Sequence, residues 1–318
     1  MLRPPRCEDY ITRRTAVTPA ITAECPRFLK FLRQASGGDA ALIGFLQRWF
    51  GYCLTGITRE HALIFLYGPG GNGKGVLLQT IGAILHDYCV TAAMETFTAS
   101  RGERHPTDLA MLHGARLVIT TETEEGQAWA EARIKALTGG DAISARFMRR
   151  NFFTYIPTFK LTVSGNHKPV LRNVDDAARR RFNMVPFLYK PSEPDTKLSD
   201  NLKDEWPGIL RWMIDGCLAW QREGLVPPSS VIEATGAYFF EQDIFAQWID
   251  ERCEVGTGLG ASNDSLVRSW RSFVVKRGEE PRTSRWLGAS LDRLGYRRGR
   301  DCDFFRGRGF LGIRPMPE

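Results

Sequence analysis

The segment GPGGNGKG, residues 68–75, constrains this chain more than any other. It lies between an apolar run at residues 62–67 and a second apolar stretch at residues 76–81 that suits a helix. The segment nearly matches the phosphate-binding loop G-x-x-x-x-G-K-[ST], in which backbone N–H groups and a lysine hold nucleotide phosphates at a helix start. Strand, glycine loop and helix in this order favour a nucleotide site over a plain turn.

We therefore predict that this loop binds ATP together with Mg²⁺. The predicted nucleotide-binding residues are Gly68, Pro69, Gly70, Gly71, Asn72, Gly73, Lys74, Gly75 and Val76. Lys74 is predicted to be catalytic, because its charge reaches the β- and γ-phosphates. Gly75 departs from the motif, since a Ser or Thr hydroxyl usually reaches Mg²⁺ from this position. Mg²⁺ commonly keeps several waters, so Gly75 does not exclude a working site.

A second strand is expected at residues 116–120, and the acidic segment TETEE follows it. ATPases of this kind usually place Asp and then Glu after such a strand. Aligned in that way, Thr121 takes the place of the Asp and Glu122 that of the Glu that polarises the attacking water. We predict Glu122 as a catalytic residue, Glu122 and Thr121 as Mg²⁺ contacts, and Glu124 as the substitute. Taken alone, a Glu-rich surface loop explains the same residues.

A third strand is expected at residues 160–164, and the loop Gly-Asn-His-Lys-Pro follows it. Asn166 can hydrogen-bond the γ-phosphate or the attacking water, so we predict it as a catalytic sensor of nucleotide state. We interpret His167 as a structural residue or a nucleic-acid contact rather than a general base. Lys168 is predicted to contact DNA.

Three consecutive arginines, residues 179–181, precede a fourth expected strand at residues 184–187. Phosphoryl transfer needs positive charge at the γ-phosphate, and a neighbouring subunit can supply an arginine for it. We predict this catalytic role for Arg180 or Arg181, and the sequence leaves the choice between them open. The alternative is a patch that forms salt bridges with Asp175 and Asp176.

Apolar strands that alternate with helical patterns favour an α/β fold with a mainly parallel sheet. The 318 residues are predicted to form a leader and helical lead-in at 1–58, a P-loop ATPase core at 59–190, a helical segment at 191–235 and a basic DNA-binding domain at 236–318. No apolar run approaches the ~18 residues of a membrane span, and the N-terminus lacks the apolar region of a secretory signal. The scattered cysteines suggest neither a zinc site nor disulfides. A cytoplasmic protein without membrane contact is expected.

The net charge of +7 is concentrated in residues 261–318, which hold thirteen Arg or Lys and seven Asp or Glu. Helices are expected at residues 238–253, 264–276 and 284–294, and a β pair with glycine at its tip at residues 302–314. This order is that of a winged helix, a relative of the helix-turn-helix proteins that bind DNA. The predicted DNA contacts here are Arg285, Arg293, Arg297, Arg298 and Arg306, beside Arg300 and Arg308. A solvated arginine-rich surface is the alternative.

Five segments in order resemble the superfamily 3 helicase module of the phage and plasmid primase-helicase family: GPGGNGKG, RLVITTETEEG, RIKALTGGDAISARFMRRNFF, PTFKLTVSGNHKP and DDAARRRFNMVPF. The resemblance runs from about Cys25 to near the C-terminus. It implies an AAA+-like P-loop core, a helical N-terminal lead-in and a C-terminal winged-helix-like domain, assembled as a hexameric, ATP-driven translocase on DNA. Lys74, Glu122 and Asn166 match the family's loop lysine, acidic motif and sensor, and Arg180 or Arg181 matches its inter-subunit finger.

The resemblance also assigns a role to residues between the second and third strands. Lys135, residues 138–141 and Arg146 match an extra family motif that leads to a hairpin lining the ring channel, with its tip at residues 147–152. Arg146, Arg149 and Arg150 are therefore expected to contact single-stranded DNA, because charge suits phosphates and neighbouring aromatic rings stack on bases. Family proteins often carry an upstream primase domain, for which this chain has no room. We expect a helicase-only protein or part of a longer product, with a separate primase as a partner.

The leading hypothesis is an ATP-dependent DNA helicase or translocase that replicates a phage, plasmid or integrated mobile element, acting as a homo-hexamer in a bacterial host cell. The first alternative is a nucleotide-dependent initiator or loader that binds DNA without processive unwinding, which Gly75 and Thr121 favour. The second is a DNA-binding protein without enzymatic activity, in which the ATPase core is a scaffold.

Overall fold

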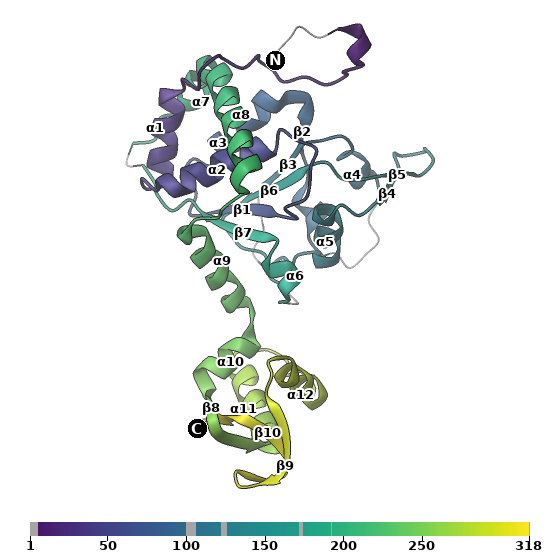
Figure 1. The fold of residues 1–318 in the computed structure, drawn as a ribbon, viewed down its shortest axis with the longest axis vertical. Coiled ribbons are helices and arrows are strands. Elements are labelled where there is room, and N and C mark those ends of the chain that lie inside the picture. The colour runs from purple at the N-terminus through teal and green to yellow at the C-terminus, as the bar shows by residue number, and fades with distance from the viewer. Residues whose placement is uncertain (1–5, 100–105, 122–125, 172–173, 192, 318) are drawn as a thin grey trace. The chain divides into compact units, whose positions relative to one another are not determined.

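The computed structural model of the chain describes residues 6–99, 106–121, 126–171, 174–191 and 193–317. The chain divides into two compact units, Met1–Tyr238 and Phe239–Glu318. Figure 1 shows the elements of both units. Within the described ranges, no helix is both long and apolar enough to cross a membrane.

The N-terminal unit is built on a five-stranded sheet with the order β2-β3-β6-β1-β7, in which every pair is parallel. The strands are β1 (Leu63–Tyr67), β2 (Cys89–Thr91), β3 (Leu117–Thr121), β6 (Lys160–Gly165) and β7 (Phe182–Pro186). The predicted α/β class with a mainly parallel sheet is therefore confirmed. Strand β2 was not predicted, because three residues are too few to show a periodic pattern.

Helices and short helical turns connect these strands. The α-helices of the unit are α1 (Pro26–Ala35), α2 (Ala40–Tyr52), α3 (Lys74–Leu85), α4 (Thr107–Ala110), α5 (Glu131–Gly139), α6 (Asp176–Arg179), α7 (Leu198–Asn201), α8 (Trp206–Glu223) and α9 (Ser229–Gln242), the last of which crosses the boundary between the units. Short 3₁₀ turns are η1 (Cys7–Asp9), η2 (His86–Tyr88), η3 (Met94–Phe97) and η4 (Lys203–Glu205). A separate hairpin pairs β4 (Ile143–Ala145) with β5 (Phe153–Tyr155).

Two helices, α1 and α2, lie within the lead-in expected at residues 1–58, and local signals explain where they begin. Pro26 is the first residue of α1, where its missing N–H costs nothing. The side chain of Asp39 caps α2 by accepting a hydrogen bond from the N–H of Leu42 at 2.9 Å. These helices form the helical lead-in that the sequence predicted.

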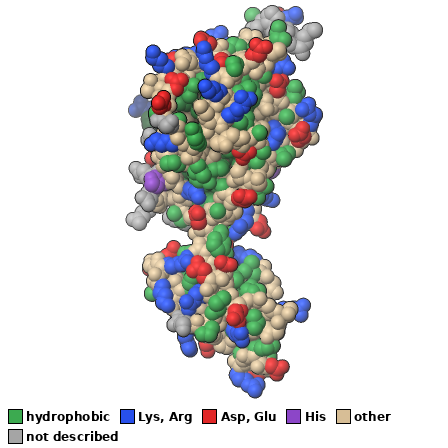
Figure 2. Space-filling view, turned by 90° about the vertical axis from the view of Figure 1, so that its left-hand side faces the viewer, with side chains coloured by type: hydrophobic (Ala, Val, Ile, Leu, Met, Phe, Trp, Pro, Cys, Tyr) green, Lys and Arg blue, Asp and Glu red, His purple; other side chains and the backbone are tan. Residues whose placement is uncertain are grey.

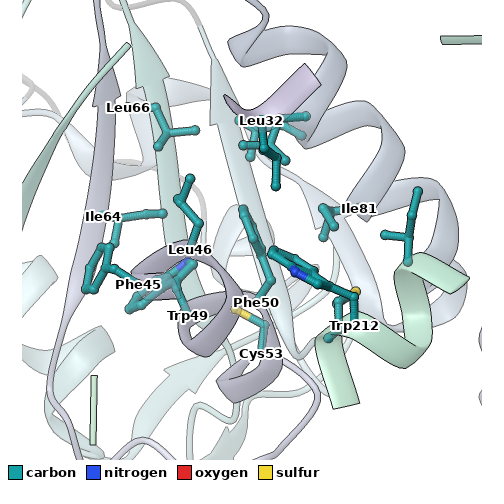
Figure 3. Packing of buried hydrophobic residues seen from close by; sticks show 14 of the residues in the cluster. Leu32, Phe45, Leu46, Trp49, Phe50, Cys53, Ile64, Leu66, Ile81 and Trp212 are labelled. Carbon is teal, nitrogen blue, oxygen red and sulfur yellow. The ribbon is translucent and has the colours of Figure 1, made fainter. Parts of the chain in front are cut away.

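Side chains of β1 alternate between the two faces of the sheet. Ile64 and Leu66 point into a large apolar cluster with Trp49 and Trp212 of the helices α2 and α8 (Figure 3). Phe65 points to the other face, where its ring meets that of Trp129 with centroids 6.0 Å apart. Because β1 is buried on both faces, its run of apolar residues is continuous. The strand that leads into the glycine loop is thus firmly fixed.

Helices α2 and α8 cross at close range on this layer. A Cβ on Gly51 would lie 2.1 Å from the backbone nitrogen of Cys217, and one on Gly216 would lie 2.1 Å from the carbonyl oxygen of Gln47. Glycine is therefore required at both positions for the two backbones to touch. The indole of Trp49 also donates to the hydroxyl of Thr162 in β6 at 2.9 Å, which ties α2 to the sheet.

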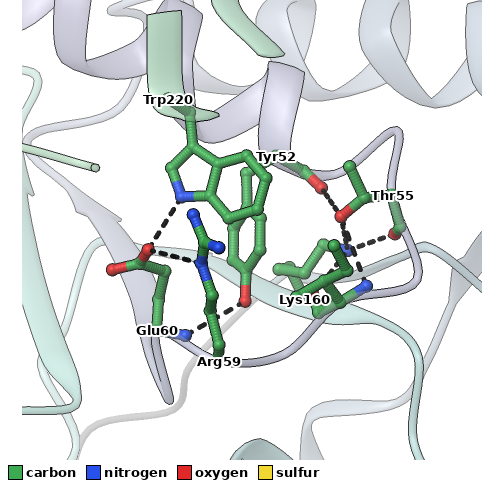
Figure 4. A network of polar contacts seen from close by, with 7 residues as sticks. Tyr52, Thr55, Arg59, Glu60, Lys160 and Trp220 are labelled. Atoms are coloured by element: carbon green, nitrogen blue, oxygen red, sulfur yellow. Dashed lines mark hydrogen bonds and ion pairs between the residues drawn. The ribbon is translucent and has the colours of Figure 1, made fainter. Parts of the chain in front are cut away.

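A buried polar network lies where β6 begins (Figure 4). The ammonium of Lys160 donates to the Thr55 carbonyl and lies 4.6 Å from the centroid of the Tyr52 ring. The whole residue is 2% exposed. The indole of Trp220 donates to a carboxylate oxygen of Glu60 at 2.8 Å. Burial lowers the pKa of Lys160 to about 8, partly offset by the nearby thiol of Cys53.

The C-terminal unit contains α10 (Ile244–Arg252), β8 (Cys253–Ser262), α11 (Asn263–Lys276), α12 (Ser284–Arg293), β9 (Arg297–Cys302) and β10 (Phe305–Pro315). The strands form an antiparallel sheet with the order β8-β10-β9. A core of its own packs the rings of Phe245, Trp248 and Trp270 against α11, α12 and β10.

Two expectations for this unit were wrong in detail, and one strand was not predicted. The helix predicted at residues 238–253 is interrupted, because the side chain of Asp243 caps a new helix by accepting from the N–H of Ala246 at 3.0 Å. Strand β8 was missed, since its glycine-rich sequence has a low strand preference. The terminal hairpin turns between Cys302 and Phe305, and Gly307 lies inside β10 with φ +80° beside a shift in strand register.

Candidate nucleotide-binding site

The glycine loop connects the end of β1 at Tyr67 with the start of α3 at Lys74, as the sequence predicted. Two of its glycines leave no room for a side chain. A Cβ on Gly68 would lie 1.9 Å from the carbonyl oxygen of Phe187, and one on Gly73 would lie 2.5 Å from the Phe31 ring. Gly73 also has a φ of +87°, which favours glycine. The loop therefore holds its path against α1 and the segment after β7. The first N–H groups of a helix have no partner within it, so those at the start of α3 are suited to bind an anion.

Lys74 is 6% exposed and lies inside the loop. Its ammonium donates to the carbonyl of Gly68 at 2.8 Å, to Oδ1 of Asn72 at 3.0 Å and to Oδ1 of Asn166 at 3.3 Å. Burial lowers the pKa of Lys74 below its usual value. Three oxygens thus hold the ammonium at the mouth of the loop, where phosphate oxygens could replace them.

The strand pairing explains why Asn166 reaches Lys74. Strand β6 lies beside β1 in the sheet, and Gly165 at its end pairs with Tyr67 at the end of β1. Asn166 is the next residue, so its side chain emerges at the edge where the loop begins. The two residues are 92 positions apart in the chain. The structure brings the predicted lysine and the predicted sensor together.

Asn72 connects the loop to the segment after β7, which the sequence did not reveal. Its side chain is 3% exposed, donates to the Phe187 carbonyl and accepts from Lys74. We predicted Asn72 only as one of the loop residues. The signal that was available is its amide side chain between glycines, since an amide can donate and accept at once.

The predicted metal contacts are only partly within the described residues. Thr121 is the last residue of β3, is exposed, and pairs with Ser164 of β6, two residues before Asn166. Glu122 and Glu124 lie outside the described residues. Gly75 is exposed, and a Cβ built on it would meet no atom within 4 Å. The space directly beside Gly75 is therefore open, and no group of three acidic, His or Cys residues that could hold a metal occurs in the described part of the chain.

The two candidate arginines lie at the other end of the sheet. Leu63 at the start of β1 pairs with Phe182, the residue after Arg181, whereas the loop follows the far end of β1 at Tyr67. Four residues of strand separate these ends by about 13 Å. Neither arginine can therefore reach the glycine loop of its own chain without a large movement.

Arg181 and Arg180 have different surroundings. Arg181 is 8% exposed, and its guanidinium donates to the hydroxyl of Thr138 at 3.2 Å and to the carbonyl of Ala177 at 2.7 Å. Burial lowers the pKa of Arg181, and the charge of Arg180 lowers it further. Arg180 is exposed directly after α6. Of the two, Arg180 is the one that can meet another molecule without breaking a buried contact.

An ion pair fixes the helix before these arginines. The side chain of Asp175 caps α6 by accepting from the N–H of Ala178 at 2.7 Å, and Lys135 of α5 donates to its other oxygen. Burial alone would raise the pKa of Asp175, but the hydrogen bonds from Lys135 and Ala178 outweigh it and lower the pKa. Lys135 and Arg181 are therefore neighbours in the fold, although the family resemblance assigned them to separate motifs.

The basic hairpin is present at the predicted place. Between β4 and β5, the guanidinium of Arg146 lies over the ring of Phe152 at 4.7 Å, and Arg149 adopts a left-handed turn conformation with φ +59°. Arg149 and Arg150 are exposed, as are the apolar side chains of Phe147, Met148 and Phe152. Exposed apolar and cationic side chains thus lie together on one turn.

Lys168 lies close to the core rather than on an open surface. Its ammonium is 4.7 Å from the centroid of the Tyr67 ring and 5.9 Å from that of Tyr238, and the residue is half-buried. The Tyr238 hydroxyl accepts from the indole of Trp129 at 3.0 Å. The geometry gives Lys168 a packing contact at the end of β1, and its predicted contact with DNA stays a prediction.

The predicted DNA contacts of the C-terminal unit lie on or beside α12 and the β9–β10 hairpin. Arg285, Arg297 and Arg306 are exposed. Arg293 donates to Ser290 at 3.2 Å, and Arg298 forms an ion pair with Asp292 that lowers the pKa of this carboxyl. A surface pocket of about 250 Å³ lies between α11, α12 and the sheet. On the face shown in Figure 2, basic side chains of this unit lie among acidic ones.

Comparison with known proteins supports the resemblance. The chain matches the Family of unknown function (DUF5906) over residues 66–181, which extend from β1 to Arg181. It is 26% identical over 234 residues to "Putative helicase L207/L206" of Acanthamoeba polyphaga mimivirus, a match that covers 67% of this chain and 24% of that protein. It is 23% identical over 145 residues to "Primase D5" of Fowlpox virus (strain NVSL), covering 42% of this chain and 17% of that protein. The chain spans less than a quarter of either protein.

A solved structure shares the fold. The apo structure of the NrS-1 C terminal region (305-718) superimposes with a TM-score of 0.60 at 13% sequence identity, covering 93% of this chain and 77% of that chain. This match confirms the predicted α/β fold class, and the viral relatives with helicase and primase names confirm the predicted resemblance.

Proposed function

We propose that this chain is the ATP-dependent motor of a DNA helicase or translocase of superfamily 3 that acts in replication. The observation that carries the proposal is the meeting of Lys74 and Asn166, at 3.3 Å, at the mouth of a glycine loop between a buried strand and a helix. A strand-to-helix turn without a ligand needs no buried ammonium there. The match to viral proteins with helicase and primase names supports the choice of DNA as the substrate of the motor.

The residues act as follows in this proposal. The loop N–H groups and Lys74 bind the β- and γ-phosphates of ATP. Asn166 exchanges its contact with Lys74 for one with the γ-phosphate or the attacking water, and Glu122 polarises that water. When bound, Mg²⁺ supplies further positive charge at the phosphates, and Thr121 and Glu122 would hold it with the help of water.

The finger of the neighbouring subunit completes the site. The arginines lie about 13 Å from the loop of their own chain along the sheet, so they serve an adjacent copy. We assign this role to Arg180, because it is exposed while Arg181 is committed to Thr138 and Ala177. A ring of copies, a homo-hexamer in this proposal, places each finger against the next loop.

Two surfaces would contact DNA. The turn with Arg149, Arg150 and exposed rings suits a single strand in the ring channel, since guanidinium groups bind phosphates and aromatic faces stack on bases. The C-terminal unit, with three helices and a three-stranded antiparallel sheet, would act as a winged-helix-like domain that binds duplex DNA through the arginines of α12 and the β9–β10 hairpin. We further propose a mobile element in a bacterial host cell as the setting and a separate primase as the partner.

DNA-stimulated ATP hydrolysis and unwinding of a forked duplex test the proposal. Lys74→Ala should abolish hydrolysis, and Arg149→Ala combined with Arg150→Ala should retain basal hydrolysis but lose stimulation by single-stranded DNA and unwinding. Arg27→Ala with Arg211→Ala, two basic residues of α1 and α8, is the matched control for the lost charge. Hydrolysis that survives Lys74→Ala would contradict the assignment of the loop.

One observation favours an initiator or loader as a second candidate. Gly75 offers no hydroxyl, and Thr121 is a weaker metal ligand than a carboxylate, so the site could bind nucleotide without rapid turnover. In that case ATP would promote DNA binding, and the protein would open a forked duplex only where it loads. Processive unwinding over a long duplex would exclude this candidate.

A further inference from the structure

The segment after β7 is held tightly against the glycine loop. The N–H of Phe187 donates to the carbonyl of Tyr67 at 2.8 Å, and its carbonyl accepts from the buried side chain of Asn72. Gly68 gives this carbonyl the space that a Cβ would fill. The backbone that leads to Lys190 is therefore anchored to the loop, three residues before the lysine.

Lys190 extends its side chain over the tip of the loop. Its Cε, Nζ and Cδ atoms lie 3.3, 3.9 and 4.0 Å from the point that a Cβ of Gly71 would occupy. Gly71 is an exposed residue in the middle of the loop with φ +78°. The ammonium of Lys190 is thus beside loop backbone whose N–H groups are predicted to face the phosphates.

Lys190 is available for a ligand. The residue is exposed, and none of the ion pairs found in the described part of the chain involves it. Its stem could simply cover the glycines while the charge stays in water, as lysine stems often do. The anchored backbone argues for more than that, because it fixes the origin of the side chain at the loop.

The loop also needs positive charge. Lys74 is buried with a lowered pKa, and position 75 provides no hydroxyl for a metal ion. A nucleoside triphosphate brings several negative charges close together, which cations must offset. A lysine ammonium is a mobile point charge on a long stem, so it can follow phosphate oxygens as they bind.

We propose that Lys190 is a phosphate-contacting residue of the nucleotide site, which acts from the same chain as Lys74 on the polyphosphate of a nucleoside triphosphate. This inference rests on the proposed function, since it takes the glycine loop as a nucleotide site. In an ordinary loop of this kind, a firmly held metal ion supplies much of the positive charge that offsets the phosphates. In this proposal Lys190 supplies part of that charge.

Calorimetric titration of the wild-type chain with ATP and Mg²⁺, beside four variants, tests the inference. Lys190→Ala should weaken ATP binding about tenfold, as the loss of one charge-assisted contact does, and Lys190→Arg should restore most of it. Lys197→Ala removes an exposed lysine seven positions further on and should bind ATP like the wild type. The affinity of Lys190→Ala should also fall less steeply with added salt.

The outcomes separate this inference from the proposed function. Wild-type binding that Lys74→Ala abolishes supports the loop as a nucleotide site whatever Lys190 does. If Lys190→Ala then binds ATP as tightly as Lys197→Ala does, and with the same salt dependence, Lys190 makes no phosphate contact. A wild-type chain that binds no ATP would overturn both proposals.

Discussion

The ammonium of Lys74 lies 3.3 Å from Oδ1 of Asn166, although the two residues are 92 positions apart. The contact exists because β1 and β6 are adjacent parallel strands that end together, so the residues that follow them emerge at one edge. This is the edge at which ligands bind in open α/β sheets. The contact therefore places Asn166, the predicted sensor, directly against the lysine of the loop.

Replacing Asn166 by Ala should separate hydrolysis from binding. We expect turnover of ATP to fall about 100-fold, the usual cost of removing one preorganised polar group, while ATP affinity changes less than about threefold. Lys74 keeps Gly68 and Asn72 as partners, so the loop should keep its shape. Asn201→Ala, an exposed asparagine of α7, is the control. Equal turnover in both variants would remove Asn166 from the site.

The sequence was sufficient for the parts of the site that depend on local order. The loop, the strand before it and the position of Asn166 after another strand follow from short patterns, and the parallel sheet places them together. The link from Asn72 to Phe187 and the cover that Lys190 gives Gly71 depend on side-chain packing between segments more than 100 residues apart. No periodicity or motif carries that information.

The arginines show the same limit. The run RRR at residues 179–181 predicted a catalytic arginine, but only the structure separates buried Arg181, which donates to Thr138 of α5, from the exposed Arg179 and Arg180. In the C-terminal unit, the helical spacing of aliphatic and aromatic residues predicted α11 and α12. Strand β8 could not be predicted, because its glycine-rich sequence is typical of a loop.

Gly75→Ser should lower the Mg²⁺ concentration needed for half-maximal ATP turnover. A Cβ at this position meets no atom within 4 Å, so the new side chain fits without rearrangement. Its hydroxyl would give the metal ion the protein contact that the loop motif normally provides. Gly75→Ala is the control, because it also replaces the glycine and raises helix preference, by up to about 1 kcal/mol, but adds no oxygen. A Mg²⁺ titration in which Ser and Ala behave alike would show that the loop never needed the hydroxyl.

Arg180→Ala and Arg181→Ala should fail in different ways. Arg180 is exposed, so its loss should leave the free energy of unfolding within about 0.5 kcal/mol of wild type while ATP turnover falls about 10³-fold. Arg181→Ala should destabilise the fold by about 1–3 kcal/mol, because Thr138 and the Ala177 carbonyl lose a buried partner. Urea denaturation and steady-state hydrolysis measure the two effects. A fall in turnover confined to Arg181→Ala would reverse the assignment.

Mixing two inactive variants tests whether Arg180 acts on a neighbouring copy. Subunits with Lys74→Ala still carry Arg180, and subunits with Arg180→Ala still carry an intact loop. A complete site forms where the intact loop of an Arg180→Ala subunit meets Arg180 of a Lys74→Ala subunit. The mixture should therefore regain part of the hydrolysis that each variant lacks alone. If Arg180 acted within its own chain, every site in the mixture would remain defective and no activity would return.

Lys160 should make the stability of the fold rise with pH in the mildly alkaline range. Burial lowers its folded pKa from 10.5 to about 8, so between these values the unfolded chain binds a proton that the folded chain does not. Below about pH 8, buried Lys160 therefore lowers the free energy of unfolding by its full amount. This penalty disappears as pH rises toward 10.5. Relative to Lys160→Met, the wild type should gain up to about 2 kcal/mol between pH 8 and 9.5, as measured by urea denaturation of both proteins. The exposed Lys197→Met should follow the wild type at every pH. A constant difference between wild type and Lys160→Met would mean that the ammonium under Tyr52 stays protonated throughout this range.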